Sequence, residues 1–408
     1  MRPRSLVPAL IAVALVLAAL PASGSAAEVR LLRNATTDFD PFITDPSPQS
    51  QAWMRKHYFQ MRGYSPYFDN QAFPWSPPPA SFYRDLYAIY NNQSGNQLIA
   101  SHPDWVLRDG AGRQLYIPWA CSGGTCPQYA GDVGNPAFRA HWIAGARNTF
   151  NYSAQRSRDG SGYAGVYIDD VNLEMKVGNG NGDLVAPIDP RTGATMTRSN
   201  WQRYVAEFLE EIRAAFPTAQ ITHNPLWWLP HSDPEVRRQV AAADVIELER
   251  GFNDDGLTKG GGKYGYNTFL DHISWLHRRG KAIVLEPYLD SAAEARYELA
   301  GYLLVRRGRD SISSGFRTEP PVGGAGGDWW RRWQTDPGRA RGGRKQRGGL
   351  WHRRYRRGTA VVNPPGSSAK TIRFKRPRRS LTGNVSRRFR LEAREGDFFR
   401  KARRGKRR

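Results

Sequence analysis

The middle of the chain alternates short apolar runs with helical patterns, and this alternation limits the fold more than any other feature. The clearest helical pattern carries apolar side chains at helical spacing from Trp201 to Phe216, as expected for a helix with one buried face. Strand followed by helix, repeated through more than half of the body, predicts a parallel sheet covered by helices. The strand-like runs are Val166–Asp169, Gln220–Asn224, Val245–Glu249, Ala282–Glu286 and Ser311–Gly315.

A closed barrel fits this pattern better than an open sheet. The body spans roughly 300 residues, and no Gly-rich phosphate loop follows any of the strand-like runs, as a nucleotide-binding sheet would require. We therefore predict an α/β fold, a (β/α)8 TIM barrel followed by a small C-terminal β unit. The first three barrel strands carry weaker patterns, and we place them near Val29–Arg33, Gln60–Tyr64 and Leu115–Pro118.

Local signals mark where several helices begin. Ser199 with Gln202, and Ser291 with Glu294, have the spacing of capping boxes, in which side chains satisfy the first free N–H groups of a helix. Asn135 followed by a proline predicts a third helix start, because proline is favoured at the first helical position.

The charge of the chain is concentrated at one end. The formal net charge is +23, yet residues 331–408 hold 28 of the 60 Lys and Arg residues and 4 of the 37 acids, so the remainder is close to neutral. Such basic runs are usually solvated, and outside a cell they could adhere to anionic cell-surface polymers. We predict no specific nucleic-acid binding, because the runs are irregular and lack interleaved aromatic residues.

The first 27 residues have the order of a secretory signal peptide. Arg2 and Arg4 precede an apolar run from Leu6 to Leu20, and small residues follow up to Ala27. The apolar run is too short to span a membrane, and no later segment is long and apolar enough to do so. We expect a secreted, extracellular protein with no transmembrane segment; an uncleaved anchor is the alternative.

The two cysteines and the histidines give no sign of a metal site. Cys121 and Cys126 lie in a Gly-rich segment, where a disulfide is expected outside the cell and two thiols alone would bind zinc poorly. The histidines lack metal-ligand spacing, and the segment from Asn179 to Asp183 lacks the closing glutamate of a calcium loop. We predict neither a metal nor another cofactor.

Alternation along the strands sends several acids to one end of the barrel. Successive side chains of a barrel strand face the interior and the helices in turn, so the aliphatic residues that suit the helix layer fix the direction of their neighbours. Each inward polar residue lies at the C-terminal end of its strand, where barrel enzymes hold their active sites. These residues are Asp169, Asn224, Glu247 with Glu249, and Glu286; Tyr167 also faces inward.

Converging carboxylates at a barrel mouth suit glycosidic bond cleavage. That reaction commonly needs a protonated acid at the leaving oxygen and an ionised carboxylate as nucleophile or base. The alternative is structural, with the acids paired to bases such as Arg250 or lying in solvent at the rim. Glu247 lies one layer deeper and is expected to be a support, while Asp170 is a loop cap or a neighbour that holds Asp169.

Aromatic residues beside the predicted strand ends could stack on sugar rings. The Trp227–Trp228 pair after Asn224 is the best candidate among them, and Tyr288 follows the strand that ends at Glu286. Each aromatic residue alone is more often a packing residue than a platform for a sugar. The others are Trp105, Trp119, Tyr129 and Trp329.

At this level of detail the chain resembles a known family, the hypothetical glycosyl hydrolase family 15. The resemblance is carried, in order, by Asp104–Asp109, Asp132–Pro136, Gly165–Asp170 and Glu249–Phe252, and covers roughly residues 30–395. The chain is more distantly similar to glycoside hydrolase family 114, the endo-α-1,4-polygalactosaminidases. The resemblance implies a TIM barrel with Asp169 and Glu249 as the catalytic pair, and Asp132 as a substrate contact near the third strand.

The expected organisation follows from these observations. We predict a signal peptide over 1–27, the barrel over 28–335, a Gly/Arg-rich linker over 336–349, a small β domain over 350–397 and a basic tail over 398–408. In the β domain, residues 358–364 form a strand and turn, with 370–374 as the partner strand.

Two functions remain open. The first is a secreted glycoside hydrolase that cleaves a poly- or oligosaccharide with Asp169 and Glu249, with Asp170, Asn224, Trp227, Glu286 and Tyr288 shaping the substrate site. The second is a barrel that binds extracellular glycans without cleaving them and uses its cationic tail for attachment. Acids locked in ion pairs with arginines would favour the second.

Overall fold

The computed structural model describes residues 29–35, 47–63, 79–157, 160, 162–313 and 330–402. In this part of the chain eight parallel strands close into a barrel, which confirms the predicted α/β barrel followed by a small β unit. In their order around the barrel, the strands are β1 (Leu31–Ala35), β10 (Ser311–Ser313), β9 (Ala282–Glu286), β8 (Val245–Glu249), β7 (Gln220–His223), β6 (Gly165–Asp169), β3 (Ala80–Asp85) and β2 (Gln60–Gly63).

The third barrel strand is β3, and our placement of it near Leu115–Pro118 is wrong. That segment lies in the long connection from β3 to β6, where Tyr116 forms isolated bridges and a two-stranded sheet joins β4 (Ala88–Tyr90) to β5 (Gln128–Ala130). Leu115 and Ile117 are buried in the hydrophobic core. The segment is therefore apolar because the connection packs against the barrel.

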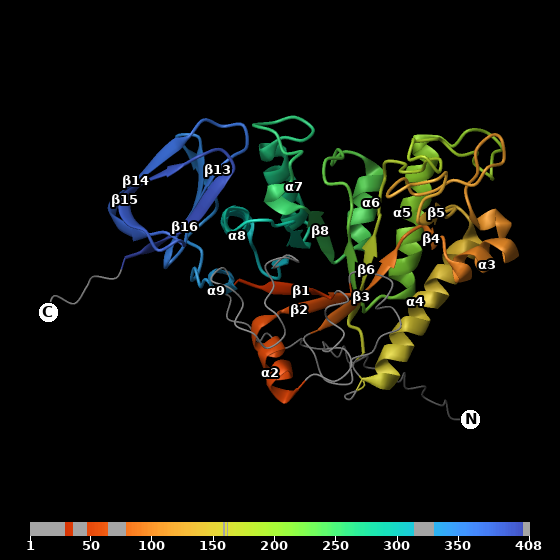
Figure 1. Cartoon of the computed structure of the whole chain (residues 1–408), viewed down its shortest axis with the longest axis horizontal. Coiled ribbons are helices and arrows are strands. Elements are labelled where there is room, and N and C mark those ends of the chain that lie inside the picture. The colour runs from red at the N-terminus through yellow and green to blue at the C-terminus, as the bar shows by residue number, and fades with distance from the viewer. Residues whose placement is uncertain are drawn as a thin grey trace, which may run out of the picture.

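Helices cover the outside of the barrel, as Figure 1 shows. The helix that begins at Ser291 has the predicted capping box, and the helix that begins after Asn135 has the predicted cap. The predicted capping box at Ser199 is wrong, because Thr197 caps the helix that begins at Arg198 by accepting a hydrogen bond from the Asn200 N–H. The helices are α2 (Pro48–His57), α3 (Gln93–Ser101), α4 (Pro136–Arg156), α5 (Arg198–Ala215), α6 (Pro234–Ala242), α7 (Tyr266–Arg278), α8 (Ala292–Val305) and α9 (Trp330–Trp333), with short 3-10 turns η3 (Pro103–Trp105) and η4 (Gly251–Asn253).

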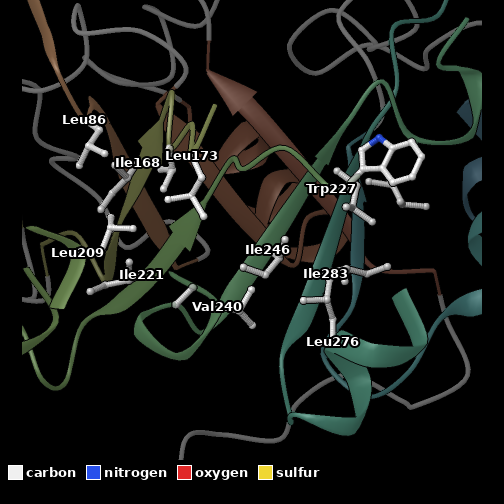
Figure 2. Packing of buried hydrophobic residues seen from close by; sticks show 14 of the residues in the cluster. Leu86, Ile168, Leu173, Leu209, Ile221, Trp227, Val240, Ile246, Leu276 and Ile283 are labelled. Atoms are coloured by element: carbon white, nitrogen blue, oxygen red, sulfur yellow. The ribbon is translucent and has the colours of Figure 1, made fainter. Parts of the chain in front are cut away.

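The aliphatic side chains of the strands form the layer between barrel and helices. Figure 2 shows strand residues packed with Leu209 of α5, Val240 of α6 and Leu276 of α7. The strand isoleucines Ile168, Ile221, Ile246, Ile283 and Ile312 have no exposed surface. Because side chains alternate along a strand, this outward packing directs the intervening residues toward the barrel interior.

The small β unit is a six-stranded antiparallel sheet that packs against α8. It begins at Lys345, inside the expected linker, and ends at Lys401, inside the expected basic tail. Residues 398–401 belong to it because Phe399 is buried in its small core, while Phe398 is buried in the main hydrophobic core. The strands, in sheet order, are β11 (Lys345–Arg347), β12 (Leu350–Arg354), β13 (Gly358–Asn363), β16 (Glu395–Lys401), β14 (Lys370–Arg379) and β15 (Val385–Leu391).

One strand pairing of this unit differs from our prediction. β13 lies between β12 and β16, whereas β14 pairs with β15 along most of its length. We expected 370–374 to be the partner of β13 because the two runs are neighbours in sequence, but β16 comes back from the end of the chain to fill that place.

Two sequence-based predictions fall outside the described residues. The leader, 1–27, and Trp329 belong to segments that are not described. Among the residues that are described, no helix is long and apolar enough to cross a membrane.

Candidate active site

Acidic side chains from neighbouring strands meet at the C-terminal end of the barrel. In the register of the sheet, Asp85 of β3 lies opposite Asp169 of β6, and Glu249 of β8 lies opposite Glu286 of β9. Asn224, directly after β7, lies between these two pairs of strands. The alternation of side chains therefore brings together the residues that we predicted, and it adds Asp85.

Asp169 accepts three hydrogen bonds. The Tyr83 hydroxyl donates to Oδ2 at 2.9 Å, and the Asn224 side-chain amide donates to Oδ1 at 2.9 Å. The backbone N–H of Asp170 also donates to Oδ1 at 2.9 Å. Three donors hold the Asp169 carboxylate in a fixed orientation.

Glu249 lies at the mouth, where solvent can reach it. The Tyr288 hydroxyl donates to Oε1 at 2.7 Å, and Asn224 Nδ2 donates to Oε2 at 3.2 Å. Partial burial by the surrounding loops raises the pKa of Glu249, the two hydrogen bonds oppose that shift, and the charges of Asp169 and Glu286 add to it. Glu249 is therefore the acid of the pair that holds a proton more readily than an ordinary glutamate.

Asn224 fixes the separation of the two carboxylates. Its Nδ2 donates to both Asp169 Oδ1 and Glu249 Oε2, so these oxygens can lie no farther apart than the two bonds laid end to end, about 6 Å. Among the described residues, neither Asp169 nor Glu249 takes part in an ion pair. Both carboxylates are therefore available for chemistry.

A buried arginine forms ion pairs with two acidic side chains in the barrel interior, beneath Asp169 and Glu249. We call these three buried residues the floor of the site. Arg62 of β2 forms ion pairs with Glu247 and with Glu286, the latter at 2.9 Å, and its guanidinium lies 4.1 Å from the Tyr167 ring centroid. The Tyr167 hydroxyl donates to Glu247 at 3.0 Å. Glu247 is thus the support that we expected. Glu286, which we expected to contact substrate, is fully buried and offers it no surface.

Replacing Arg62 by methionine is expected to lower the free energy of unfolding by about 3–5 kcal/mol, because two buried carboxylates would lose their counter-ion. Urea unfolding measures this loss. Arg203→Met is the matched control, since Arg203 makes an exposed ion pair with Glu207 that contributes less than about 1 kcal/mol. Equal losses in the two variants would show that Arg62 does not hold the floor together.

Asp85 and Asp170 complete an acidic group around Asp169. Burial, followed by the charge of Asp169, raises the pKa of Asp85 to about 7, although Gln128 and the Ala88 N–H stabilise its charge. Burial and the charges of Asp85, Asp169 and Glu249 raise the pKa of Asp170 well above its ordinary value. The group is therefore partly protonated near neutral pH.

The backbone turns sharply just after both members of the pair. Asp170 and Arg250, each directly following a strand-end acid, have φ values of 51° and 62°. This left-handed region is uncommon for residues other than glycine, and such strain concentrates at functional sites. The turns leave Asp169 and Glu249 at the ends of β6 and β8, facing the mouth.

A cavity of about 360 Å³ opens beside the pair. Its lining includes Asp170, Asn224, Glu249, Trp228 and Tyr264, and the last two rings lie 5.3 Å apart. A larger cavity, of about 870 Å³, lies between α3 and α4 and contains neither Asp169 nor Glu249. The smaller cavity is therefore the candidate substrate site.

Trp227 and Trp228, the predicted pair, both line this cavity, but they differ in exposure. Trp227, our candidate, is 5% exposed and packs edge-on against Phe269 at 5.0 Å, so it belongs mainly to the core. Trp228 is the more accessible ring. The sequence could not separate them, because the path of the loop decides which of two consecutive side chains turns inward.

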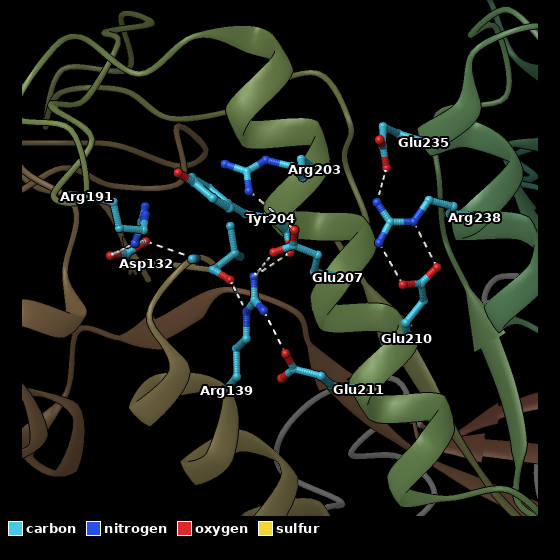
Figure 3. Close-up of polar contacts among 12 residues, drawn as sticks. Asp132, Arg139, Arg191, Arg203, Tyr204, Glu207, Glu210, Glu211, Glu235 and Arg238 are labelled. Atoms are coloured by element: carbon cyan, nitrogen blue, oxygen red, sulfur yellow. Dashed lines mark hydrogen bonds and ion pairs between the residues drawn. The ribbon is translucent and has the colours of Figure 1, made fainter.

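Asp132, the substrate contact implied by the resemblance, is held in a buried ion pair. It is 1% exposed, and Arg191 donates to it at 2.8 Å, as Figure 3 shows. The Gly134 N–H also donates to Asp132, and a side chain at Gly134 would collide with the Arg191 guanidinium. These contacts give Asp132 a structural role in the loop before α4.

On the opposite side of the mouth, an exposed tryptophan lies just before a loop that a disulfide closes. Cys121 and Cys126 are bonded, as predicted. Trp119 is 51% exposed and donates its indole N–H to the side chain of Gln128, which in turn donates to Asp85 at 3.1 Å. Tyr83 contacts both Asp85 and Asp169, so hydrogen bonds link Trp119 to the centre of the site.

Three of the site residues were not predicted from the sequence. Asp85 and Tyr83 lie on the misplaced third strand, where alternation would have pointed both inward. Arg62 lies on a strand that we located but whose faces we did not assign, although Met61 next to it is the apolar residue that packs outward. No group of metal-binding side chains occurs among the described residues.

Enzymes with a (β/α)8 barrel hold their active sites at the C-terminal ends of the strands, which is where this barrel has its polar and acidic residues. A family model, the hypothetical glycosyl hydrolase family 15, matches residues 67–359, a narrower span than the resemblance suggested. The chain belongs to this family. Family and fold together support the hydrolysis of glycosidic bonds, and with it a carbohydrate substrate.

Solved structures of glycoside hydrolases are similar to the chain at low identity. The glycoside hydrolase domain of PelA from Pseudomonas aeruginosa shares 16% identity over 73% of this chain and 97% of that chain, with a TM-score of 0.39. An alpha-amylase from Geobacillus thermoleovorans, complexed with acarbose, shares 9% identity over 91% and 97%, with a TM-score of 0.46. No curated protein matches the chain.

Proposed function

We propose that the protein is a secreted glycoside hydrolase in which Asp169 and Glu249 act as a retaining pair. The observation that carries this proposal is the shared contact with Asn224, which keeps oxygens of the two carboxylates within about 6 Å of each other. Retaining enzymes hold their carboxyl groups about 5–5.5 Å apart, whereas inverting enzymes leave about 6.5–9.5 Å for a water molecule. The limit of about 6 Å applies to one oxygen of each carboxylate, and it agrees with the spacing of a retaining pair.

The roles that we propose for the two carboxylates rest on their different surroundings. Glu249, whose pKa is raised by burial, is the acid that protonates the leaving oxygen and then the base that activates water. Asp169, with three donors, is the nucleophile that attacks the anomeric carbon to form a glycosyl ester. Water then releases the sugar from Asp169, and Glu249 regains its proton in that step.

Substrate contacts are proposed on both sides of the pair. Asn224, Asp170 and Trp228 line the cavity on one side, and Tyr288, which is 42% exposed, lies against Glu249. Trp119 lies on the other side, where its anchored indole N–H leaves the ring face open for stacking on a sugar. A substrate that reaches both sides is a chain of several sugar units.

Trp119→Ala is expected to raise KM for a polysaccharide substrate about tenfold, or roughly 1.4 kcal/mol of lost stacking. Val385→Ala is the control, because Val385 is exposed on β15 of the small β unit. Steady-state kinetics on polymer and on a short oligosaccharide locate the effect. If Trp119→Ala and Val385→Ala have the same KM for the polymer, Trp119 is not a substrate contact.

Secretion is part of the proposal. The disulfide between Cys121 and Cys126 supports it, because disulfides form and persist mainly in oxidising compartments outside the cytoplasm. Mass spectrometry of the exported protein should find an N-terminus close to residue 28.

The test of the proposed function is a digestion screen. The wild-type protein, Asp169→Asn and Glu249→Gln are incubated with amino-sugar and neutral polysaccharides, and new reducing ends are measured. The proposal expects cleavage by the wild-type protein alone; equal activity in all three would end the assignment.

The non-catalytic alternative rests on one observation, the ion pairs that hold Glu247 and Glu286 on Arg62. These two acids lie beneath the mouth and lack exposed surface. Because Asp169 and Glu249 lie outside those ion pairs, the arrangement supports hydrolysis over binding alone.

A further inference from the structure

The strands β14 and β15 form the outer layer of the small β unit. Figure 1 places them at the end of the molecule farthest from the barrel strands. One face of this ribbon is apolar, and it packs on the neighbouring strands β12, β13 and β16. The side chains of this small core are Leu350, Val361, Ile372, Phe374, Phe389, Leu391 and Phe399.

The opposite face of the ribbon is basic, because side chains alternate along each strand. Arg373 and Lys375 of β14 and Arg388 and Arg390 of β15 are all exposed. Arg376, at the bulge in β14, is exposed as well. We call these five side chains the cationic face.

Two of these arginines face each other across the strands. Arg373 and Arg388 are direct partners in the antiparallel register. Opposite residues in such a pair have Cβ atoms about 4.5–5.5 Å apart, and like charges at that distance destabilise a sheet. The sheet thus carries an unfavourable pair at a position where most polar residues would serve the fold equally well.

The charge of the cationic face is hardly neutralised within the chain. Residues 370–391 contain nine Lys and Arg residues and no Asp or Glu. Within the described part of the protein, Arg390 pairs with Glu392, and no other member of the face has an acidic partner. Burial and the charges of Arg354 and Arg376 lower the pKa of nearby Arg378, as expected where positive charge accumulates.

We propose that the cationic face is a binding site for an anionic polysaccharide, which neutralises this charge and holds the enzyme on a charged extracellular matrix. Seven of the nine basic residues are arginines, whose planar guanidinium binds carboxylate and sulfate-like oxyanions through two parallel hydrogen bonds. Residues two apart on one strand repeat about every 6.6 Å, so the face presents charges in rows along an extended polymer.

The same face argues against other polyanions. Phe374 and Phe389 point into the core, so these strands offer no aromatic ring to stack on the bases of a single-stranded nucleic acid. The cationic face also lies on β14 and β15, neither of which lines the cavity beside Glu249. This site is therefore separate from the proposed catalytic site, and its extracellular partner rests on the proposed secretion of the protein.

Binding of the full mature chain to immobilised heparin and to polygalacturonate tests the proposal. The variant Arg373→Gln/Arg388→Gln/Arg390→Gln is compared with Arg198→Gln/Arg237→Gln/Arg278→Gln, which removes the same charge from exposed positions on α5, α6 and α7. We expect the first variant to lose at least tenfold in affinity and the second to stay within about twofold of wild type. Added salt should weaken wild-type binding steeply, since the contacts are exposed ion pairs.

Three outcomes would overturn the proposal. Equal losses in the two triple variants would show that net charge alone drives retention. Unchanged binding by the first variant would place the contact elsewhere. Tighter binding of an oligonucleotide or of phosphatidylglycerol vesicles than of either polysaccharide, at equal charge, would assign the face to a different partner.

Thermal unfolding separates loss of the site from loss of the fold. Because the variant removes the repulsion between Arg373 and Arg388, its Tm should be equal to or above that of wild type. A lower Tm together with weaker binding would mean that the arginines support the sheet, and the proposal would fail.

Discussion

Asp169→Asn is expected to lower kcat by on the order of 10⁴-fold on the polysaccharide that the wild-type protein cleaves. The amide keeps the size of the side chain but is a poor nucleophile, so no glycosyl ester forms at a useful rate. Asp254→Asn is the matched control, because Asp254 lines the same cavity while its carboxylate caps a turn by accepting the Gly256 N–H.

The two variants should differ clearly in kcat. We expect Asp254→Asn to keep kcat within a few-fold of wild type, and Asp169→Asn to keep a normal Tm while losing turnover. A loss of less than tenfold in Asp169→Asn would mean that another group attacks the sugar.

Glu249→Gln is expected to lower kcat/KM by 10²–10⁴-fold on a natural polysaccharide, because the leaving oxygen would depart without a proton. The loss should be much smaller on an activated aryl glycoside, whose leaving group departs as a stable anion. Comparing the two substrates in steady-state kinetics therefore identifies Glu249 as the acid.

The pH profile gives an independent check. A general acid works only while protonated, so activity falls as pH rises through its pKa, and the raised pKa of Glu249 places this fall above the range of an ordinary glutamate. Tyr288→Phe removes a donor that stabilises the ionised form, so it should raise the pKa of Glu249 and move the fall to higher pH. A fall that persists unchanged in Glu249→Gln would exclude Glu249 as the acid.

Alternation along the strands was enough to predict which acids meet at the C-terminal end of the barrel. In β6, β8 and β9, two aliphatic residues mark the outward face, so the polar residue at the strand end must point into the barrel. Side chains alternate in β3 as well, but Phe82 is the one large apolar residue on its outward face. The Leu115–Pro118 segment is more apolar, so it resembled a strand more closely than β3 did.

Other features depend on contacts that no local pattern encodes. Arg62 meets Glu247 and Glu286 because β2, β8 and β9 face the same interior from different sides of the ring. Asp132 could be recognised as an ion-pair partner of Arg191 once the loop that carries Arg191 was folded over it. The same holds for β16, whose position beside β13 is set by the burial of Phe398 and Phe399.

In the basic C-terminal region, the high density of positive charge made ordered strands difficult to recognise from the sequence. The arginine-rich ends of this region were predicted to be linker and tail, yet β11 and the end of β16 lie there. Within β14, apolar residues such as Ile372 and Phe374 alternate with exposed basic residues. Solvation of the outer face costs little, so a strongly basic ribbon remains compatible with a buried apolar layer beneath it.

Proton NMR of the first product released from the cleaved polysaccharide tests the central claim most directly. A carboxylate pair joined through Asn224 predicts that the new reducing end initially has the same anomeric configuration as the bond that was broken. An initial product of the opposite configuration would contradict the assignment of Asp169 as nucleophile, because a water molecule would then have to attack the sugar directly.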